Sequence, residues 1–343
     1  MNRAVSCLLC LLLLLSWVLP ARAGDAMVEQ DEPLPEDIDV SAYSAVLMDM
    51  DTGSFLYEYE ADETNYPAST TKIMTSLLVL KYGDTSDTVT VTSEAFEDIS
   101  DLASTGGLEV GETMTVHRLL QIMLVISASE AANVAAIYLC GNRADFVDMM
   151  NQEAQALGCT GTHFANCHGL PNPDHYTTAR DLAIIANAAM EYPEFREIVG
   201  SAVTTLEATN YTSEWTVVST NGILPGSRYP EYNYPYAIGI KTGHTSVAGY
   251  CLVSAADKDG LRLLCVVMGT PSRVSSFAQT IDLFDWGYDN YEILTYGMTP
   301  ETEAPEAPDM TQVVEDIPEE EITPPPLPSP SPTPEPEVSP TLT

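Results

Sequence analysis

Basic residues are scarce in this chain. Its 343 residues include 13 Lys and Arg against 50 Asp and Glu, which gives a formal net charge of −37. A protein that binds nucleic acid through its phosphates needs clustered Lys and Arg, so the composition excludes that class of function. Only four residues are lysines: Lys72, Lys81, Lys241 and Lys258. A lysine that falls in a chemical motif is therefore unusually informative here.

Long apolar runs are absent after the first 23 residues. Those residues contain Arg3, an apolar run over 8–19 and Ala21-Arg22-Ala23, which is the pattern of a secretory signal peptide. We expect cleavage after Ala23, and an uncleaved N-terminal anchor is the alternative. A membrane-spanning helix needs about 20 apolar residues, and no later segment supplies them. We therefore expect an exported protein.

Cysteines are few. Five of the seven remain after the predicted cleavage site. Cys159 and Cys167 flank a short turn, and Cys251 and Cys265 flank a predicted hairpin. Either pair is close enough in sequence to form a disulfide in an oxidising compartment, and five free thiols are the alternative.

The composition predicts an ordered middle between two different ends. Residues 24–39 are expected to form an acidic linker and residues 299–343 an acidic tail, and half of the 24 prolines lie in 301–343. Such a tail cannot bury enough apolar surface to fold and favours extended polyproline II, so we expect a disordered spacer. It contains no amphipathic segment that predicts a C-terminal membrane anchor. The folded domain is then expected over 40–291.

Hydrophobic periodicity predicts helices in the centre of this domain and strands on both sides. A hairpin is expected over 45–60, with its turn at 51–53. The predicted helices are 70–81, 116–126, 130–139, 144–156 and 179–188, followed by strands 237–241, 248–255 and 261–268 and a last helix over 274–288. This order predicts an α+β domain in which one antiparallel sheet takes strands from both ends and a helical subdomain is inserted between them.

The first chemical motif is Pro67-Ala68-Ser69-Thr70-Thr71-Lys72, at the start of a predicted helix. Residues three apart on a helix lie on one face, so the side chains of Ser69 and Lys72 are within reach of each other. A lysine is a poor base at its ordinary pKa of about 10.4, but burial or a second cation lowers that pKa toward about 7 to 8. Lys72 is then able to take the proton of Ser69 and make it a nucleophile.

Two further motifs supply partners for such a nucleophile. Ser127-Ala128-Ser129 lies in the break between two predicted helices, where a hydroxyl can relay a proton. Lys241-Thr242-Gly243-His244-Thr245 ends a predicted strand, where Gly243 allows close approach of a substrate chain. The backbone N–H groups of Ser69 and His244 are candidates for an oxyanion hole.

These motifs, S-x-x-K, S-x-N and K-T-G in this order, resemble those of the serine penicillin-recognising enzymes. The stretches 67–72, 168–182 and 239–245 are similar in particular to those of D-alanyl-D-alanine carboxypeptidases, the low-molecular-mass penicillin-binding proteins. The resemblance covers about residues 40–291. It implies a β-lactamase/DD-peptidase-like fold and removal of the terminal D-Ala from peptidoglycan stem peptides that end in D-Ala-D-Ala. It also implies that β-lactam antibiotics are covalent inhibitors and that no metal or cofactor takes part. With the predicted signal peptide, it implies a location on the extracellular or cell-wall (periplasmic) side of a bacterial membrane.

The resemblance also assigns roles to residues. Ser69 is the implied nucleophile, Lys72 its base and Ser127 the proton relay. Lys241 and Thr242 are implied to hold the terminal carboxylate or the lysine–serine pair, next to Gly243, and the N–H of His244 serves the oxyanion hole. The four remaining histidines are expected to be structural or surface residues: His117, His163, His168 and His175.

One departure from the family pattern keeps two other functions open. Ser129 stands where S-x-N has its Asn, and a hydroxyl is shorter than an amide and has fewer donors. This replacement affects the substrate-peptide contact and suggests a β-lactam-sensing or wall-binding module with little turnover as an alternative. A β-lactamase is the other alternative, although no Glu-x-x-x-Asn segment between 127 and 241 offers a deacylating carboxylate.

Overall fold

The computed structural model describes residues 38–101 and 103–295. The predicted signal peptide, nearly all of the predicted acidic linker and the Pro-rich tail lie outside these residues. The division of the chain into a linker, a domain over 40–291 and a tail therefore stays a prediction.

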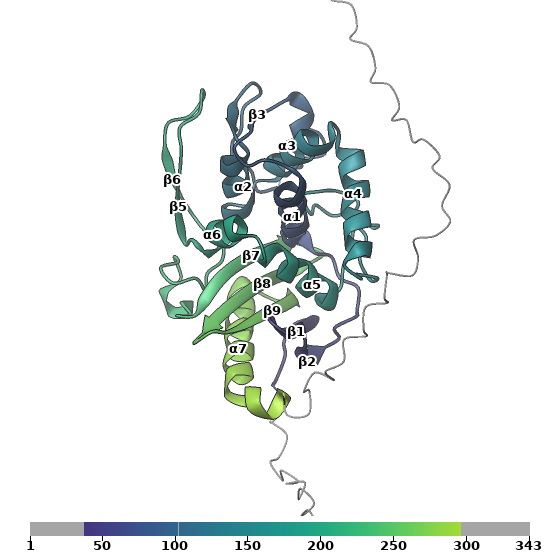
Figure 1. Ribbon diagram of the computed structural model, residues 1–343, viewed down its shortest axis with the longest axis vertical. Coiled ribbons are helices and arrows are strands. Elements are labelled where there is room, and N and C mark those ends of the chain that lie inside the picture. The colour runs from purple at the N-terminus through teal and green to yellow at the C-terminus, as the bar shows by residue number, and fades with distance from the viewer. Residues whose placement is uncertain (1–37, 102, 296–343) are drawn as a thin grey trace, which may run out of the picture. The chain divides into compact units, whose positions relative to one another are not determined.

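An antiparallel sheet forms the centre of the domain and joins the two ends of the described chain (Figure 1). Its strand order is β2-β1-β9-β8-β7, so the first strand lies beside the last one, with Leu47 opposite Cys265. The strands are β1 Ser44–Asp49, β2 Phe55–Tyr59, β7 Ala237–Thr245, β8 Gly249–Lys258 and β9 Leu261–Thr270. The α+β fold with strands from both ends is confirmed.

Both faces of the sheet are covered, which explains its continuous apolar strands. On β1, Val46 and Met48 belong to a core on one face, whereas Ala45 and Leu47 belong to a second core on the other. Alternate residues of a strand point to opposite faces, so a strand buried on both sides is apolar throughout. Helix α7, Arg273–Thr295, covers the second face, and the other long helices lie on the first (Figure 1).

The predicted helices all form, and α1 lies at the centre of them. Every residue of α1 from Lys72 to Val79 is buried, because helices α2 to α5 surround it. The bounds are α1 Lys72–Tyr82, α2 Val116–Val125, α3 Ser129–Cys140, α4 Arg143–Ala156 and α5 Ala179–Met190.

Several elements differ from the sequence-based expectation. Helix α7 continues to Thr295 because aromatic side chains along it pack on the second core. Strand β7 extends to Thr245, so it carries the whole third motif. The elements without a prediction include α6 Pro193–Gly200 and two small sheets, β3 Thr88–Thr90 with β4 Thr113–Thr115 and β5 Val203–Leu206 with β6 Trp215–Val218.

The cysteines within the described residues are all free thiols. Neither Cys159 and Cys167 nor Cys251 and Cys265 form a disulfide, so the alternative of five free thiols is confirmed. Burial raises the pKa of Cys159 and of Cys167 to about 12, so both are protonated and behave as small apolar side chains. Over the same residues, none of the helices is both long and apolar enough to cross a bilayer.

Candidate active site

The Ser69 motif forms a tight turn that leads directly into α1. A short 3₁₀ helix over Ala68–Thr71 precedes the helix, and Ala68 has a positive φ of 50°. The hydroxyl of Thr70 donates to the carbonyl of Pro67 at 2.7 Å, and that of Thr71 donates to the carbonyl of Ala68 at 2.8 Å. These bonds satisfy carbonyls at the turn and keep Ser69, which is half-buried, at the mouth of a cavity.

Lys72 has the environment of a general base. Its side chain is fully buried, and its Nζ donates to Ser69 Oγ at 3.0 Å, to the carbonyl of His168 at 2.6 Å and to Ser129 Oγ at 3.4 Å. Burial lowers the pKa of Lys72 to about 7, although the nearby Cys167 and Glu130 act in the opposite direction. A neutral amine within hydrogen-bond distance of the Ser69 hydroxyl is therefore available near neutral pH.

A loop of the central region supports the Ser69 turn from behind. A Cβ on Gly169, whose φ is +89°, would lie 1.8 Å from the carbonyl oxygen of Ala68, so only glycine fits there. His175 is buried, accepts the N–H of Ala165 at Nδ1 and places Nε2 2.8 Å from Thr71 Oγ1. Burial lowers the pKa of His175 to about 3, so its neutral ring acts as a fixed spacer.

The histidines expected to be structural occupy such positions. His168 is buried, and its Nδ1 accepts the N–H of Leu170. His163 Nδ1 contacts the carbonyl of Asp174, and His117 pairs with Glu194. None of these four rings lines the catalytic cavity.

The Ser127 motif lies between α2 and α3, as predicted. Ser127 has a positive φ of 68° and lines the cavity that Ser69 opens into. Among the described residues, however, it is Ser129 and not Ser127 whose hydroxyl bonds Lys72. The N–H of Ser129 also donates to the carbonyl of Ser104 at 2.9 Å, and Ser104 lines the same cavity.

The third motif forms the edge strand β7 and passes directly over the Ser69 turn. A Cβ on Gly243 would lie 2.9 Å from the carbonyl oxygen of Pro67 and 3.2 Å from the amide nitrogen of Ser69. The strand thus brings the backbone next to His244 close to the N–H of Ser69, where two donors can converge on one oxygen. Thr242 Oγ1 donates to Thr220 Oγ1 at 2.6 Å within the cavity.

Lys241, the lysine of strand β7, is buried. Its Nζ donates to the carbonyl of Thr242 at 2.9 Å. The pKa of Lys241 lies well below its usual value because the side chain is buried and because Lys72 and Arg273 are near. A bound carboxylate would favour the protonated form of Lys241.

The three motifs meet around one cavity of about 150 Å³. Ser69, Ser127, Thr242, Gly243 and His244 of the predicted set line it, whereas Lys72, Ser129 and Lys241 lie behind its wall. Lining residues without a prediction are Ser104, Thr220, Tyr250, Cys251, Arg273 and Ser276.

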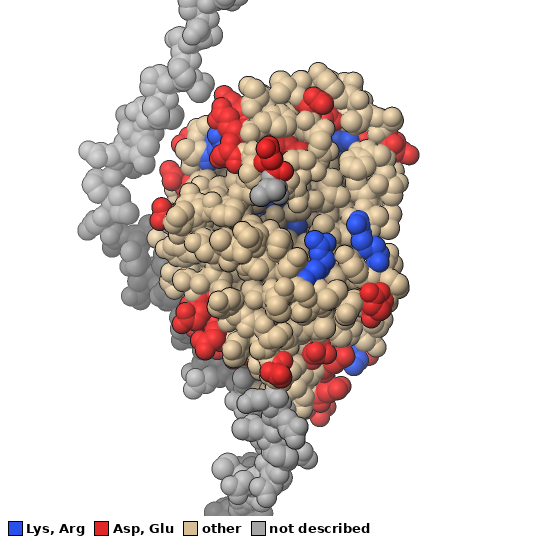
Figure 2. Space-filling view, turned by 180° about the vertical axis from the view of Figure 1, so that it is seen from behind, with Lys and Arg blue, Asp and Glu red and all other residues tan. Residues whose placement is uncertain are grey.

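Arg273 is the residue of this additional set with the clearest chemistry. It begins α7, its side chain is exposed, and it is the guanidinium that lines the cavity. Figure 2 shows basic side chains in the middle of one face, between acidic groups above and below. In a chain with 13 basic residues, a search for an anion-binding base beyond the lysines would have included Arg273. The site therefore offers a nucleophile, a buried base, paired N–H donors and a cationic end.

Known proteins are similar to this chain in sequence. A family model described as D-alanyl-D-alanine carboxypeptidase matches residues 28–272. The D-alanyl-D-alanine carboxypeptidase DacF of Bacillus subtilis is 34% identical over 301 residues, which are 85% of this chain and 72% of DacF. DacA of Haemophilus influenzae is also 34% identical, over 74% of this chain and 63% of DacA.

Solved structures are similar to this chain in fold. The crystal structure of the Streptomyces K15 DD-transpeptidase superposes with a TM-score of 0.69 at 30% identity, over 74% of this chain and 100% of that one. The D-alanyl-D-alanine carboxypeptidase DacD from Francisella tularensis superposes with a TM-score of 0.65 at 27% identity, over 74% of this chain and 72% of that one.

Proposed function

The chain belongs to the D-alanyl-D-alanine carboxypeptidase family, and we propose that it removes the terminal D-Ala of peptidoglycan stem pentapeptides through an acyl-enzyme on Ser69. The observation that supports this most directly is the contact of Ser69 Oγ with the buried amine of Lys72, in a turn that β7 crosses at Gly243. The enzyme is a serine-type carboxypeptidase, and the roles below are our assignment.

Acylation begins with proton transfer from Ser69 Oγ to the neutral Nζ of Lys72. The Oγ attacks the carbonyl carbon of the penultimate D-Ala, and the resulting oxyanion accepts hydrogen bonds from the N–H groups of Ser69 and His244. The C–N bond then breaks, and the leaving amine of the terminal D-Ala takes up a proton from Lys72 by way of Ser127, which lines the cavity. A water molecule hydrolyses the ester in the same sequence of proton transfers.

The free carboxylate of the substrate is directed toward the cationic end of the cavity. The hydroxyl of Thr242 and the guanidinium of Arg273 line that end, with Lys241 buried behind them. An arginine keeps its charge at any physiological pH and binds carboxylates with a planar pair of donors, so Arg273 provides the permanent charge. Ser129 contacts Lys72, so we assign it to positioning of the base rather than to the substrate contact of an Asn.

We further propose export to the cell-wall side of the membrane, where peptidoglycan is available, and covalent inhibition by β-lactams. A β-lactam carries a strained amide and a carboxylate at positions that match the scissile bond and the free carboxylate of the peptide. The acyl-enzyme on Ser69 is then the common intermediate of the substrate and the inhibitor.

Two measurements together test the function: the release of D-Ala from a peptide, and the lifetime of the bond between the protein and labelled penicillin. The protein is incubated with a diacetyl-Lys-D-Ala-D-Ala peptide and separately with labelled penicillin. We expect steady D-Ala release and a penicillin label that persists far longer than one peptide turnover. A persistent label without D-Ala release contradicts the carboxypeptidase and supports a sensor, whereas rapid loss of the label supports a β-lactamase.

Lys241→Gln is expected to lower kcat/KM for the peptide by about 10- to 100-fold. The substitution removes the buried amine behind the end of the cavity that receives the substrate carboxylate, and an interaction with a charged group contributes about 1.5 to 3 kcal/mol. The matched control is Lys258→Gln, since Lys258 ends β8 and its Nζ lies over the rings of Tyr236 and Tyr288, far along the sheet from the cavity. The measurement is steady-state D-Ala release at several peptide concentrations. Equal effects of the two substitutions would remove Lys241 from the binding site.

A further inference from the structure

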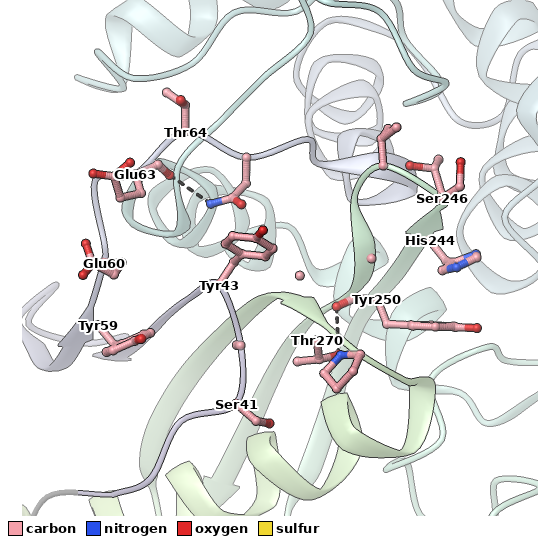
Figure 3. A pocket seen from close by; sticks show the side chains of 17 residues that line it. Ser41, Tyr43, Tyr59, Glu60, Glu63, Thr64, His244, Ser246, Tyr250 and Thr270 are labelled. Carbon is pink, nitrogen blue, oxygen red and sulfur yellow. Dashed lines mark hydrogen bonds between the residues drawn. The ribbon is translucent and has the colours of Figure 1, made fainter.

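A groove of about 1040 Å³ begins where the catalytic cavity ends (Figure 3). It lies between the start of β1, the turn that follows β2 and the ends of β7 and β9. His244 and Tyr250 line both the groove and the cavity, and their rings stack with centroids 4.0 Å apart. The groove is much larger than the 150 Å³ cavity, and its volume is at the upper end of the range for small-molecule sites.

The direction of β7 determines which part of a substrate enters this groove. The strand runs from Lys241, at the carboxylate end, past Gly243 at the scissile bond to Thr245, which lines the groove. A peptide whose carboxylate lies near Lys241 and whose reacting carbonyl lies near Gly243 continues toward Thr245. One extended residue spans about 3.3 to 3.6 Å, so the residue next to D-Ala-D-Ala is the first to reach the groove.

The lining of the groove favours a cation. Among the described residues that line it there is no Lys or Arg, and the carboxylates of Glu60 and Glu63 have no ion-pair partner there. Burial and the nearby Arg273 lower the pKa of His244, so this ring adds no positive charge at neutral pH. Figure 3 shows Glu60 and Glu63 on the side opposite His244.

Two exposed aromatic rings accompany the carboxylates. Tyr43 is 73% exposed and lies between the two sides of the groove, and Tyr59 is 39% exposed beside Glu60 (Figure 3). Tyr43 is firmly placed, because its N–H donates to the carbonyl of Met268 and its ring packs directly on Gly269. Ring faces combined with carboxylates are the chemistry that binds ammonium groups.

We propose that this groove is a subsite for the acyl side of the substrate, and that Glu60, Glu63 and the Tyr43 and Tyr59 rings select a side chain with a free ammonium group next to D-Ala-D-Ala. The inference rests on the proposed function. It adds a substrate class, namely stem peptides whose diamino-acid side chain is not cross-linked, because cross-linking converts that ammonium into a neutral amide.

Three peptides that differ at one nitrogen test this subsite. They are Nα-acetyl-Lys-D-Ala-D-Ala with a free ε-amine, the same peptide with a dimethylated ε-amine, which keeps the charge, and the diacetyl peptide, which removes it. We expect the full chain to show about five-fold higher kcat/KM for both charged peptides than for the diacetyl peptide, mainly through KM. This ratio should fall toward one as salt is raised to about 0.5 M.

The ratio is then measured in two double variants. Glu60→Gln with Glu63→Gln is expected to bring it close to one. Glu214→Gln with Glu231→Gln removes the same charge from exposed residues outside the groove and is expected to keep the wild-type ratio. Since both rate constants come from one preparation, loss of folded protein cancels in the ratio.

Each outcome has a defined meaning. A wild-type ratio near one overturns the subsite while the carboxypeptidase stands. A ratio that survives in Glu60→Gln with Glu63→Gln overturns the assignment to these carboxylates. Failure to release D-Ala from all three peptides overturns the proposed function, and the subsite with it.

Discussion

Ser69→Ala is expected to abolish both penicillin labelling and D-Ala release, with a loss of at least about 10⁴-fold in the rate of release. The substitution removes the one oxygen that forms the acyl-enzyme. It leaves the Ser69 turn intact, because that turn is held by the hydroxyls of Thr70 and Thr71. Lys72 also keeps its bond to the carbonyl of His168.

The measurement is mass spectrometry of the protein after incubation with penicillin, combined with an assay for free D-Ala. Ser213→Ala, at an exposed position far along the chain, is the matched control and should label fully. Thermal unfolding of Ser69→Ala close to that of the wild type shows that the fold is retained. A label that survives in Ser69→Ala identifies another nucleophile and contradicts our assignment.

The rate of acylation is expected to rise with pH through an apparent pKa of about 7, set by Lys72. A general base must be neutral, and burial lowers the pKa of this amine from 10.5, so the active fraction is high above pH 7 and falls about tenfold per pH unit well below it. Lys72→Arg should lose about 10²- to 10⁴-fold in rate, since a guanidinium does not act as a base at these pH values.

The control for the pH profile is Lys81→Arg, because Lys81 lies at the other end of α1 and pairs with Glu153 at 2.7 Å. The hydrogen bond that Lys81 donates to Glu153 raises the pKa of Lys81, so this lysine stays charged and should not affect the profile. Second-order rate constants for penicillin acylation between about pH 5 and pH 9 provide the test. If the acylation rate of the wild type fell only below about pH 10, the base would be another group. The same conclusion would follow if Lys72→Arg kept the full rate and the same pH dependence.

Local sequence patterns predicted the strands of the central sheet and helices α1 to α5 and α7, but not α6 or the two small sheets. The predicted elements have patterns that are visible within a short segment. The apolar spacing of α1 and the Asp-Thr-Gly turn of the first hairpin are visible in a window of a dozen residues. The end of α7 was predicted too early, since its last two turns are held by packing on the sheet and not by a strong periodic pattern. The free cysteines likewise required the structure, because proximity in sequence does not determine the distance between sulfur atoms.

The candidate site was likewise predicted only in part from the sequence. Residues within one motif, such as Ser69 and Lys72, were predicted as partners because helix geometry alone brings them together. The carbonyl of His168 was not predicted as a ligand of Lys72, since a backbone oxygen carries no sequence signal. Arg273 and the groove beyond His244 also required the structure, because they combine segments more than 200 residues apart.

The sequence by itself determined which chemistry this protein is able to perform. A serine three residues before a lysine, followed by a serine pair and a Lys-Thr-Gly strand, predicts an acylating enzyme, and two of the four lysines of the chain lie in these motifs. Only the tertiary structure determined the pKa of the base and the residues that line the groove beyond the cavity. Packing of α1 among helices α2 to α5 buries Lys72 and lowers its pKa to about 7, and the turn after β2 brings Glu60 and Glu63 to the groove. Burial and distance between remote segments are properties of the packed chain, so no local pattern encodes them.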